Sequence, residues 1–204
     1  MPAATPAARA GERPVRLIAY ALLGTFFVVA LVLLWPISWN RPFQVDEVEH
    51  VHAAYNVRMG RLIYEDFRQT HNPLLYFALR PLVGPEDPVG TYHRARLLTT
   101  ALFTLTVVLC GLCAGRLGGL PAGLLAAGLA LVHTTFADRG PEIRPDGPVA
   151  LCLSAALLVE LSGMRRLRRY GVEALLLSVA FLLTNKASFA CFAFGCLWLF
   201  AYGT

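Results

Sequence analysis

Two adjacent carboxylates, Asp46 and Glu47, follow the first long apolar stretch of the chain. A carboxylate at a membrane boundary can accept a proton from a hydroxyl or an amine, and partial burial raises the pKa of such a group, so general-base catalysis is one interpretation. The alternative is structural, because acidic side chains in the first turn of a helix complement the helix dipole. The residues alone leave both interpretations open.

A second charged segment, residues 138–148, is rich in proline and glycine. Within it, Arg144 is suited to bind a phosphate group, and Asp146 is suited to assist at a reacting centre or to orient that arginine. The alternative for Asp146 is a helix start, because Gly147 and Pro148 follow it directly. Function and capping are equal alternatives for this segment.

Lys186 lies between the last two apolar stretches of the chain. As a point charge, its ammonium group is suited to hold a lipid phosphate at the membrane interface. The alternative is that the lysine extends from a helix end to reach water, as cationic side chains commonly do near membranes.

The sequence does not predict a metal site. His50 and His52 are two residues apart on an expected helix, which points them to nearly opposite sides. Cys110 and Cys113 lie in an apolar stretch without partner ligands, so we interpret them as a packed thiol pair. All five cysteines lie in apolar runs, and no disulfide framework follows from them. The absence of a glycine-rich phosphate loop and of a nucleophile elbow argues against soluble nucleotide chemistry.

The composition indicates a membrane protein. Of the 204 residues, 56% are hydrophobic and 15% are charged, whereas a soluble domain averages ~25% charged residues. Residues 17–38 are uncharged and long enough to cross a ~30 Å hydrocarbon layer. A cleaved signal peptide is the alternative, but this run exceeds the usual ~7 to 15 residue apolar region and ends at Trp35 and Trp39 instead of a small-residue cleavage site. We therefore expect a retained membrane anchor.

Five further uncharged stretches lead us to expect an all-α integral membrane protein with about six transmembrane helices. These stretches cover residues 97–115, 117–137, 147–159, 174–185 and 187–204. A break that contains glycines and Pro121 separates the first two of them. Gly111, Gly115, Gly119 and Gly123 recur every four residues around this break, which predicts close helix packing through small residues.

The loop between the first two expected spans, residues 39–96, is far longer than a connection requires. We expect two short helices in it, an amphipathic one over residues 45–59 and an apolar one over residues 74–83 that suits the membrane interface. The first helix is expected to carry Val48, Val51 and Tyr55 on one face and Asp46, Glu49 and His50 on another. The length of the loop indicates that a site is built there.

Charge sets the expected orientation. If residues 1–16 form a cytoplasmic basic tail, eight basic and three acidic residues lie inside, and ten of each lie outside. The whole net charge of +5 then lies on the cytoplasmic face, as the positive-inside rule requires, and it does not indicate a nucleic-acid partner. Both charged segments and Lys186 are placed together on the outer side.

Four motifs in order resemble the N-terminal module of the C-type (GT-C) polytopic membrane glycosyltransferases. They are the Asp46-Glu47 pair, the segments Gly60–Phe67 and Thr70–Tyr76, and Arg144-Pro145-Asp146. The resemblance covers the chain from residue 15 onward. It is closest to the branch of protein O-mannosyltransferases, aminoarabinose transferases and bacterial lipopolysaccharide-core transferases, which use polyprenyl-phosphate sugars. Asn72 stands where the family pattern often has proline.

The resemblance implies roles for individual residues. Asp46, with Glu47 beside it, would be the general base that activates the acceptor. His71 and Lys186 would lie near the donor phosphate. Cationic groups would hold that phosphate as it leaves, and the single displacement would invert the configuration of the anomeric carbon.

The resemblance also implies the setting of the reaction. The enzyme would transfer a sugar from a polyprenyl-phosphate lipid to a glycan, lipid or protein acceptor on the extracytoplasmic face of a bacterial plasma membrane. Arg144 and Asp146 match the family's Arg-Pro-Asp element, whose role the resemblance does not fix. No organic cofactor is implied, and the need for a divalent cation is left open.

Members of this family continue beyond a sixth span. We therefore expect residues 17–204 to be a truncated module that needs a partner chain or a missing C-terminal half. The alternative function is a non-catalytic membrane scaffold or lipid-binding subunit. A small transporter is less favoured, because the sequence shows no intramembrane charged pair and no inverted repeat.

Overall fold

The structure is a computed structural model that describes residues 6–202, with side chains for residues 17–200. Within this range every regular element is a helix, and only an isolated bridge between Ile63 and Phe67 has β geometry. The expectation of an all-α fold is therefore confirmed. Residues 1–5 of the expected cytoplasmic tail, and the side chains of its arginines, lie outside the described residues.

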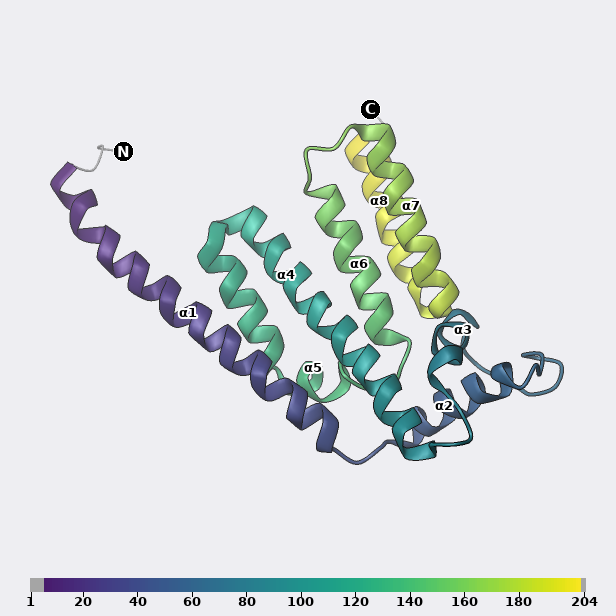
Figure 1. Cartoon of the computed structure of the whole chain (residues 1–204). Coiled ribbons are helices and arrows are strands. Elements are labelled where there is room, and N and C mark those ends of the chain that lie inside the picture. The colour runs from purple at the N-terminus through teal and green to yellow at the C-terminus, as the bar shows by residue number, and fades with distance from the viewer. Residues whose placement is uncertain (1–5, 203–204) are drawn as a thin grey trace.

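The helices follow the apolar stretches of the sequence (Figure 1). They are α1 (Pro6–Asn40), α2 (Val45–Arg58), α3 (Leu74–Leu79), the 3-10 turn η1 (Arg80–Leu82), α4 (Pro88–Val132), α5 (Thr134–Arg139), α6 (Asp146–Glu160), α7 (Arg166–Leu183), the 3-10 turn η2 (Asn185–Ala187) and α8 (Ser188–Tyr202). Both short helices expected in the long loop are present, as α2 and as α3 with η1.

α7 extends beyond its apolar stretch. The uncharged stretch begins at residue 174, but α7 already begins at Arg166. Arg166 Nε donates a hydrogen bond to Tyr170 Oη at 2.9 Å, four residues later on the same helix face. Side-chain pairs with this spacing stabilise a helix, which explains why the polar start of this segment is helical.

α4 is a hairpin of two helical arms, with its turn at Gly119 (Figure 1). Gly119 has φ 78° and ψ −178°, a conformation that is open to glycine and strained for other residues. Beyond the turn, a Cβ atom on Gly123 would lie 2.7 Å from the carbonyl oxygen of Gly111 and 3.3 Å from Cα of Gly115. The predicted packing role is confirmed for these three glycines. It was wrong for Gly119, which forms the turn.

The long helices lie side by side (Figure 1), with α1 against α4, α4 against α6 and α6 against α7. One apolar core joins α1 to both arms of α4 through Leu34, Phe103, Val107, Ala127 and Leu131. A larger core lies at the end of the bundle where α2 and α3 pack, and it includes Val51, Tyr76, Ala95, Ile143 and Ala180. This second core supports the charged residues described below.

The contact between α4 and α6 also contains the two cysteines of the predicted thiol pair. Cys110 Sγ lies 3.5 Å from Ser154 Oγ, and Cys113 Sγ lies 3.6 Å from the carbonyl oxygen of the same serine. Both thiols are free. Their interpretation as packing residues is confirmed.

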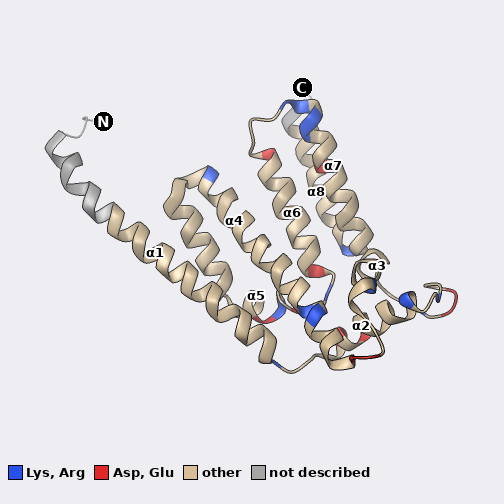
Figure 2. Cartoon of the chain, viewed as in Figure 1, with Lys and Arg blue, Asp and Glu red and all other residues tan. Residues whose placement is uncertain are grey.

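Charged residues gather toward the two ends of the bundle, with few between them (Figure 2). At the end away from α2, Arg169 of α7 lies 3.5 Å from Glu160 of α6, between Nε and Oε2. Trp198 Nε1 of α8 donates to Glu173 Oε2 of α7 at 2.8 Å. These contacts tie the last three long helices together at that end.

Within the part of the chain that the structure describes, two helices are long and apolar enough to cross a membrane. They are Leu17–Asn40, with a mean hydropathy of 2.7, and the helix Pro88–Val132, with 2.2. A shorter apolar helix covers Asn185–Phe200. Apolar side chains on α1 have no protein cover, since Leu17 is 67% and Val32 is 63% exposed.

The hairpin packing gives a first prediction. Gly123→Ala should lower the free energy of unfolding by about 1–3 kcal/mol, because the added Cβ meets backbone atoms of the other arm that cannot move independently. Gly24→Ala is the matched control, because nothing lies within 4 Å of a Cβ at that position. Thermal unfolding in detergent measures both variants. Equal melting temperatures would contradict the described approach of the two arms.

Candidate functional site

A buried ion pair joins Glu47 of α2 to Arg96 of α4. The two side chains are 0% and 1% exposed. Arg96 Nε donates to Glu47 Oε1 at 3.0 Å, and Arg96 Nη2 donates to Glu47 Oε2, so the pair is bidentate. The other Arg96 N–H groups donate to the carbonyl oxygens of Ser38, Arg41 and Pro42, at and just beyond the end of α1. All five donors of this guanidinium therefore have acceptors.

The Glu47 carboxylate also accepts two backbone hydrogen bonds. Gln44 N donates to Oε2 at 2.9 Å, and Ile143 N donates to Oε1 at 3.2 Å. The first of these caps the start of α2, so the structural interpretation is confirmed for Glu47. Because the carboxylate is enclosed by four donor groups and has no exposed surface, its geometry is that of a positioning residue rather than that of a base reached by an acceptor.

The buried face of α2 includes a charged side chain. Glu47, His50, Val51 and Ala54 are buried, whereas Val48 is 44% exposed. Val48, Val51 and Tyr55 line one cavity of about 280 Å³ together, so the prediction that these three residues share a face is confirmed. His52 is exposed while His50 is buried, which confirms that these two histidines point apart.

Asp46 has the opposite environment to its neighbour. Its side chain is 50% exposed, and its Oδ2 lies 3.1 Å from Arg144 Nη1. Arg144 Nε lies 3.4 Å from Asp146 Oδ2, and Lys186 Nζ lies 3.8 Å from Asp146 Oδ1. We call these four residues, Asp46, Arg144, Asp146 and Lys186, the charge cluster. Three segments far apart in the sequence thus bring four of the predicted site residues into one line of ion pairs.

Asp146 has features of both predicted alternatives. α6 begins at Asp146, which is the acidic residue of its first turn, as the helix-start alternative predicts. The carboxylate also contacts Arg144 and Lys186. Asp146 therefore orients both cations of the charge cluster.

Glu142, which we did not predict, fixes the arginines behind this cluster. Its side chain is fully buried and accepts from Arg41 Nη2 at 2.6 Å, from Arg139 Nη1 at 3.2 Å and from Arg144 Nη1 at 3.3 Å. Charge-assisted hydrogen bonds of this kind fix the direction of a guanidinium. The position of Glu142 between two arginines in one short segment was the available sequence signal.

His71 lies next to His50, with 5.2 Å between the ring centroids. Among the described residues, its Nδ1 is buried without a hydrogen-bond partner. Tyr64 Oη donates to the carbonyl oxygen of His71 at 2.9 Å, and Asn72 Nδ2 donates to the carbonyl oxygen of Phe181 in α7. Asn72 thus anchors the loop of His71 to α7, a role that the proline of the family pattern could not perform.

Burial, followed by the charge on the neighbouring His71, lowers the pKa of His50 to about 4. The charges on Asp46 and Asp146 raise the pKa of His50, and the charge on Arg144 lowers it. His50 is therefore neutral near pH 7, with its Nδ1 3.4 Å from Tyr76 Oη. Its spacing of four residues from Asp46 on α2 was the signal that this histidine belongs to the site.

A cavity of about 240 Å³ lies between α4, α5 and α6 and reaches the charge cluster at Asp146. Phe103 and Phe136 line it with apolar surface, and His133 and Arg139 supply polar groups. The lining of this cavity therefore combines apolar surface with polar and charged groups.

The described residues contain no group of three or more His, Cys, Asp or Glu side chains placed to hold a metal ion. In the charge cluster, both Asp46 and Asp146 contact Arg144 instead.

Comparisons with known proteins do not identify the chain, because no protein-family model, no curated protein and no solved structure matches it.

The buried pair gives a second prediction. Arg96→Leu should lower the free energy of unfolding by about 3–5 kcal/mol, because Glu47 would be left as a buried charge without its partner. Arg94→Leu is the control, because the ion pair of Arg94 with Asp87 is largely exposed, and it should cause a much smaller loss. The double variant Glu47→Leu/Arg96→Leu should recover part of the loss. Chemical unfolding in detergent checks all three variants, and a greater loss for Arg94→Leu than for Arg96→Leu would contradict the assignment.

A third prediction concerns pH. The pKa of His50 is near 4 in the folded chain and about 6.5 when unfolded, so the unfolded state takes up a proton first as the pH falls. Stability should therefore decline between pH 6.5 and 4, by on the order of 3 kcal/mol, and His50→Gln should remove that part of the decline. His52→Gln, at an exposed position on the same helix, should leave it unchanged. If the free energy of unfolding falls with pH equally steeply in the wild type and in His50→Gln, the low pKa of His50 is contradicted.

Proposed function

We propose that the chain is the N-terminal membrane module of a GT-C type glycosyltransferase, which transfers a sugar from a polyprenyl-phosphate donor to an acceptor. The observation that carries the proposal is the charge cluster, in which a half-exposed carboxylate, Asp46, lies 3.1 Å from a cation, Arg144. A proton acceptor beside a phosphate-binding group is the pair of functions that this reaction needs.

Membrane embedding is supported by exposed apolar surface. A soluble protein rarely leaves large contiguous apolar patches without cover, yet α1 and α8 expose Leu22, Leu33, Phe189, Phe192 and Phe200. We propose that α1, the two arms of α4, α6, α7 and α8 are six membrane spans. Because α6 and α8 each have 15 residues and therefore extend about 22 Å, the bilayer is locally thinned around them.

The proposed orientation places the N-terminus in the cytoplasm of a bacterial cell and the charge cluster on the extracytoplasmic side. The charges at the two ends of the bundle support this orientation (Figure 2). The basic residues Arg116 and Arg165–Arg169 lie at the end away from α2, where the positive-inside rule requires them. The balanced acids and bases of residues 39–96 lie at the other end.

In the proposed reaction, Asp46 accepts the proton of a hydroxyl group on the acceptor. The oxygen of that hydroxyl group forms a bond to the anomeric carbon at the same time. The bond from that carbon to the phosphate oxygen breaks at the same time, and the phosphate leaves with the electron pair. Arg144 and Lys186 stabilise the negative charge on the leaving phosphate. The cavity beside Asp146 holds the first part of the donor's apolar chain.

Glu47 and His71 complete the proposed site in different ways. Glu47 positions α2 through Arg96 and does not touch substrate. His71 lies near the donor phosphate, where its buried Nδ1 is free to donate or accept a hydrogen bond. The ring of His50 lies beside it, with 5.2 Å between the ring centroids.

A non-catalytic scaffold or lipid-binding subunit is the second candidate. The observation that favours it is the apolar face of α8, where Phe189, Phe192 and Phe200 are 81%, 74% and 86% exposed. A helix from a partner chain packs on such a face as readily as lipid does. This candidate keeps the scaffold and the cavity but has no transfer reaction.

A fourth prediction separates the two candidates. Asp46→Asn should lower the rate of sugar transfer from a radiolabelled polyprenyl-phosphate donor by about 10²- to 10⁴-fold, because it removes the proton acceptor and keeps the shape of the side chain. Glu49→Gln is the control, because Glu49 is exposed on the same helix and lies outside the charge cluster. It should transfer sugar at the wild-type rate.

The assay uses membranes that contain the chain together with any further segment or partner encoded beside it. Equal activity of the wild type and Asp46→Asn would remove Asp46 from the base role. Transfer by none of the proteins, with donor binding retained, would favour the scaffold.

A further inference from the structure

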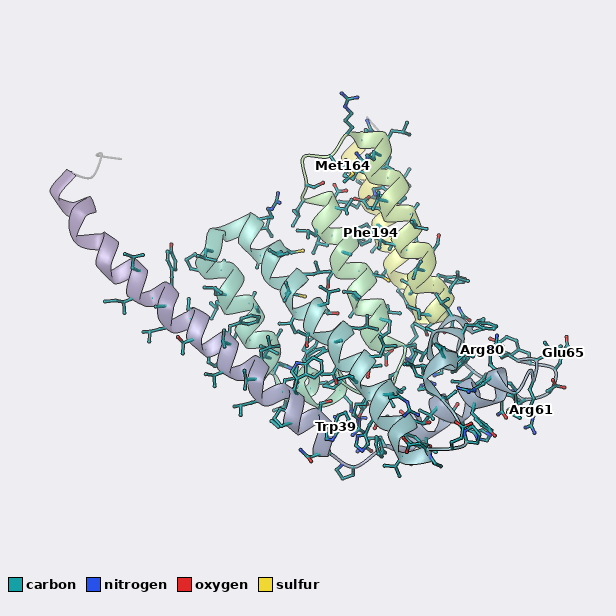
Figure 3. The ribbon with its side chains drawn as sticks, viewed as in Figure 1. Trp39, Arg61, Glu65, Arg80, Met164 and Phe194 are labelled. Carbon is teal, nitrogen blue, oxygen red and sulfur yellow. The ribbon has the colours of Figure 1, made fainter. Side chains whose placement is uncertain are left out.

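A second cavity, of about 420 Å³, lies away from the charge cluster, at the far end of α2. The end of α2, the loop that follows it and α3 with η1 surround this cavity. Its lining includes Arg61, Tyr64, Glu65, Phe77 and Arg80. Figure 3 shows Arg61, Glu65 and Arg80 together at this projecting end of the molecule. The volume lies in the range of small-molecule sites.

The loop that forms one wall is built by specific hydrogen bonds. Asp66 Oδ2 accepts from Leu62 N at 2.6 Å, and Tyr64 N donates to the carbonyl oxygen of Phe67 at 2.9 Å. Arg61 Nη1 donates to Oδ1 of the buried Asn56 at 3.0 Å, which directs the guanidinium. This wall is therefore preorganised rather than a chance surface hollow.

Tyr64 adds an independent observation. Among the described residues it alone combines a side chain with a positive φ, of 74°. Bulky residues rarely adopt this conformation, and such strain concentrates where a side chain serves a ligand. Tyr64 lines the cavity, and 58% of the residue is exposed.

The lining determines the chemistry of the ligand. Arg61 and Arg80 outnumber the one carboxylate, Glu65, so the cavity favours an anion. Within the described part of the chain, the guanidinium of Arg80 has no hydrogen-bond or ion-pair partner. The exposed rings of Tyr64 and Phe77 offer flat apolar faces, which pack against the C–H faces of sugar rings, and the cations bind a carboxylate or phosphate on the sugar.

We infer that this cavity binds an anionic saccharide. As an acceptor subsite, this assignment rests on the proposed function. The cavity begins at Gly60, about 20 Å along α2 from Asp46, so an acceptor bound there must be longer than one sugar to reach the base. The hydrogen bond from Tyr64 Oη to the carbonyl oxygen of His71 joins the cavity wall to the loop beside the charge cluster.

A fifth prediction tests the binding site without any transfer reaction. The full chain in detergent is titrated with trigalacturonate, with the neutral trisaccharide maltotriose and with inorganic phosphate, using isothermal titration calorimetry. Trigalacturonate should bind saturably and more tightly than either of the others. Arg80→Gln should weaken its binding by about tenfold or more, since a charge-assisted contact is lost.

Three further variants make the test specific. Arg68→Gln, at an exposed arginine of the same loop that does not line the cavity, should change the affinity by less than about twofold. Phe77→Ala should weaken the binding of trigalacturonate and the binding of maltotriose to the same extent. Asp46→Asn should bind trigalacturonate with the wild-type affinity. The binding result is therefore independent of whether Asp46 is the base in sugar transfer.

Three outcomes would overturn the inference. The first is the absence of saturable trigalacturonate binding. The second is equal weakening by Arg68→Gln and Arg80→Gln, which would indicate attraction by general charge. The third is phosphate binding as tight as trigalacturonate binding, which would indicate a simple anion site.

Discussion

The bidentate contact between Glu47 and Arg96 is the constraint on which one whole end of the fold depends. Carbonyl groups at the end of a helix lack partners within that helix, and a cation there also complements the helix dipole. Arg96 meets this need for the end of α1, while Glu47 caps α2 and holds the backbone at Ile143. One buried pair therefore fixes α1, α2, α4 and the loop before α6 relative to one another.

This constraint explains why two adjacent carboxylates have different roles. Successive residues of an α-helix point about 100° apart, so the inward direction of Glu47 sets the direction of Asp46. Asp46 then lies against Arg144 and stays half exposed, in the position where an acceptor can reach it. The cost of burying an ion pair is balanced by complete hydrogen bonding, and Asp46, the proposed base, is left accessible.

Apolar runs and glycine and proline signals predicted much of this fold. They placed α2, α3 and the hairpin break of α4, because periodicity and backbone conformation are local properties. They did not predict the burial of Glu47 and of His50, because these depend on Arg96 and on His71, which lie far away in the sequence. Charge counting placed Asp46, Arg144, Asp146 and Lys186 on one side, but the contacts of Glu142 that direct Arg144 required the folded chain.

Arg144 connects structure and proposed chemistry because three carboxylates share it. Glu142 holds it from the buried side, while Asp46 and Asp146 contact it from the exposed side. In the proposed reaction, the donor phosphate competes with Asp46 for this guanidinium. Its arrival weakens the contact of Asp46 with Arg144 and so strengthens the attraction of the carboxylate for the acceptor proton. The base is then activated when the donor is in place, which limits the reaction to the complete substrate complex.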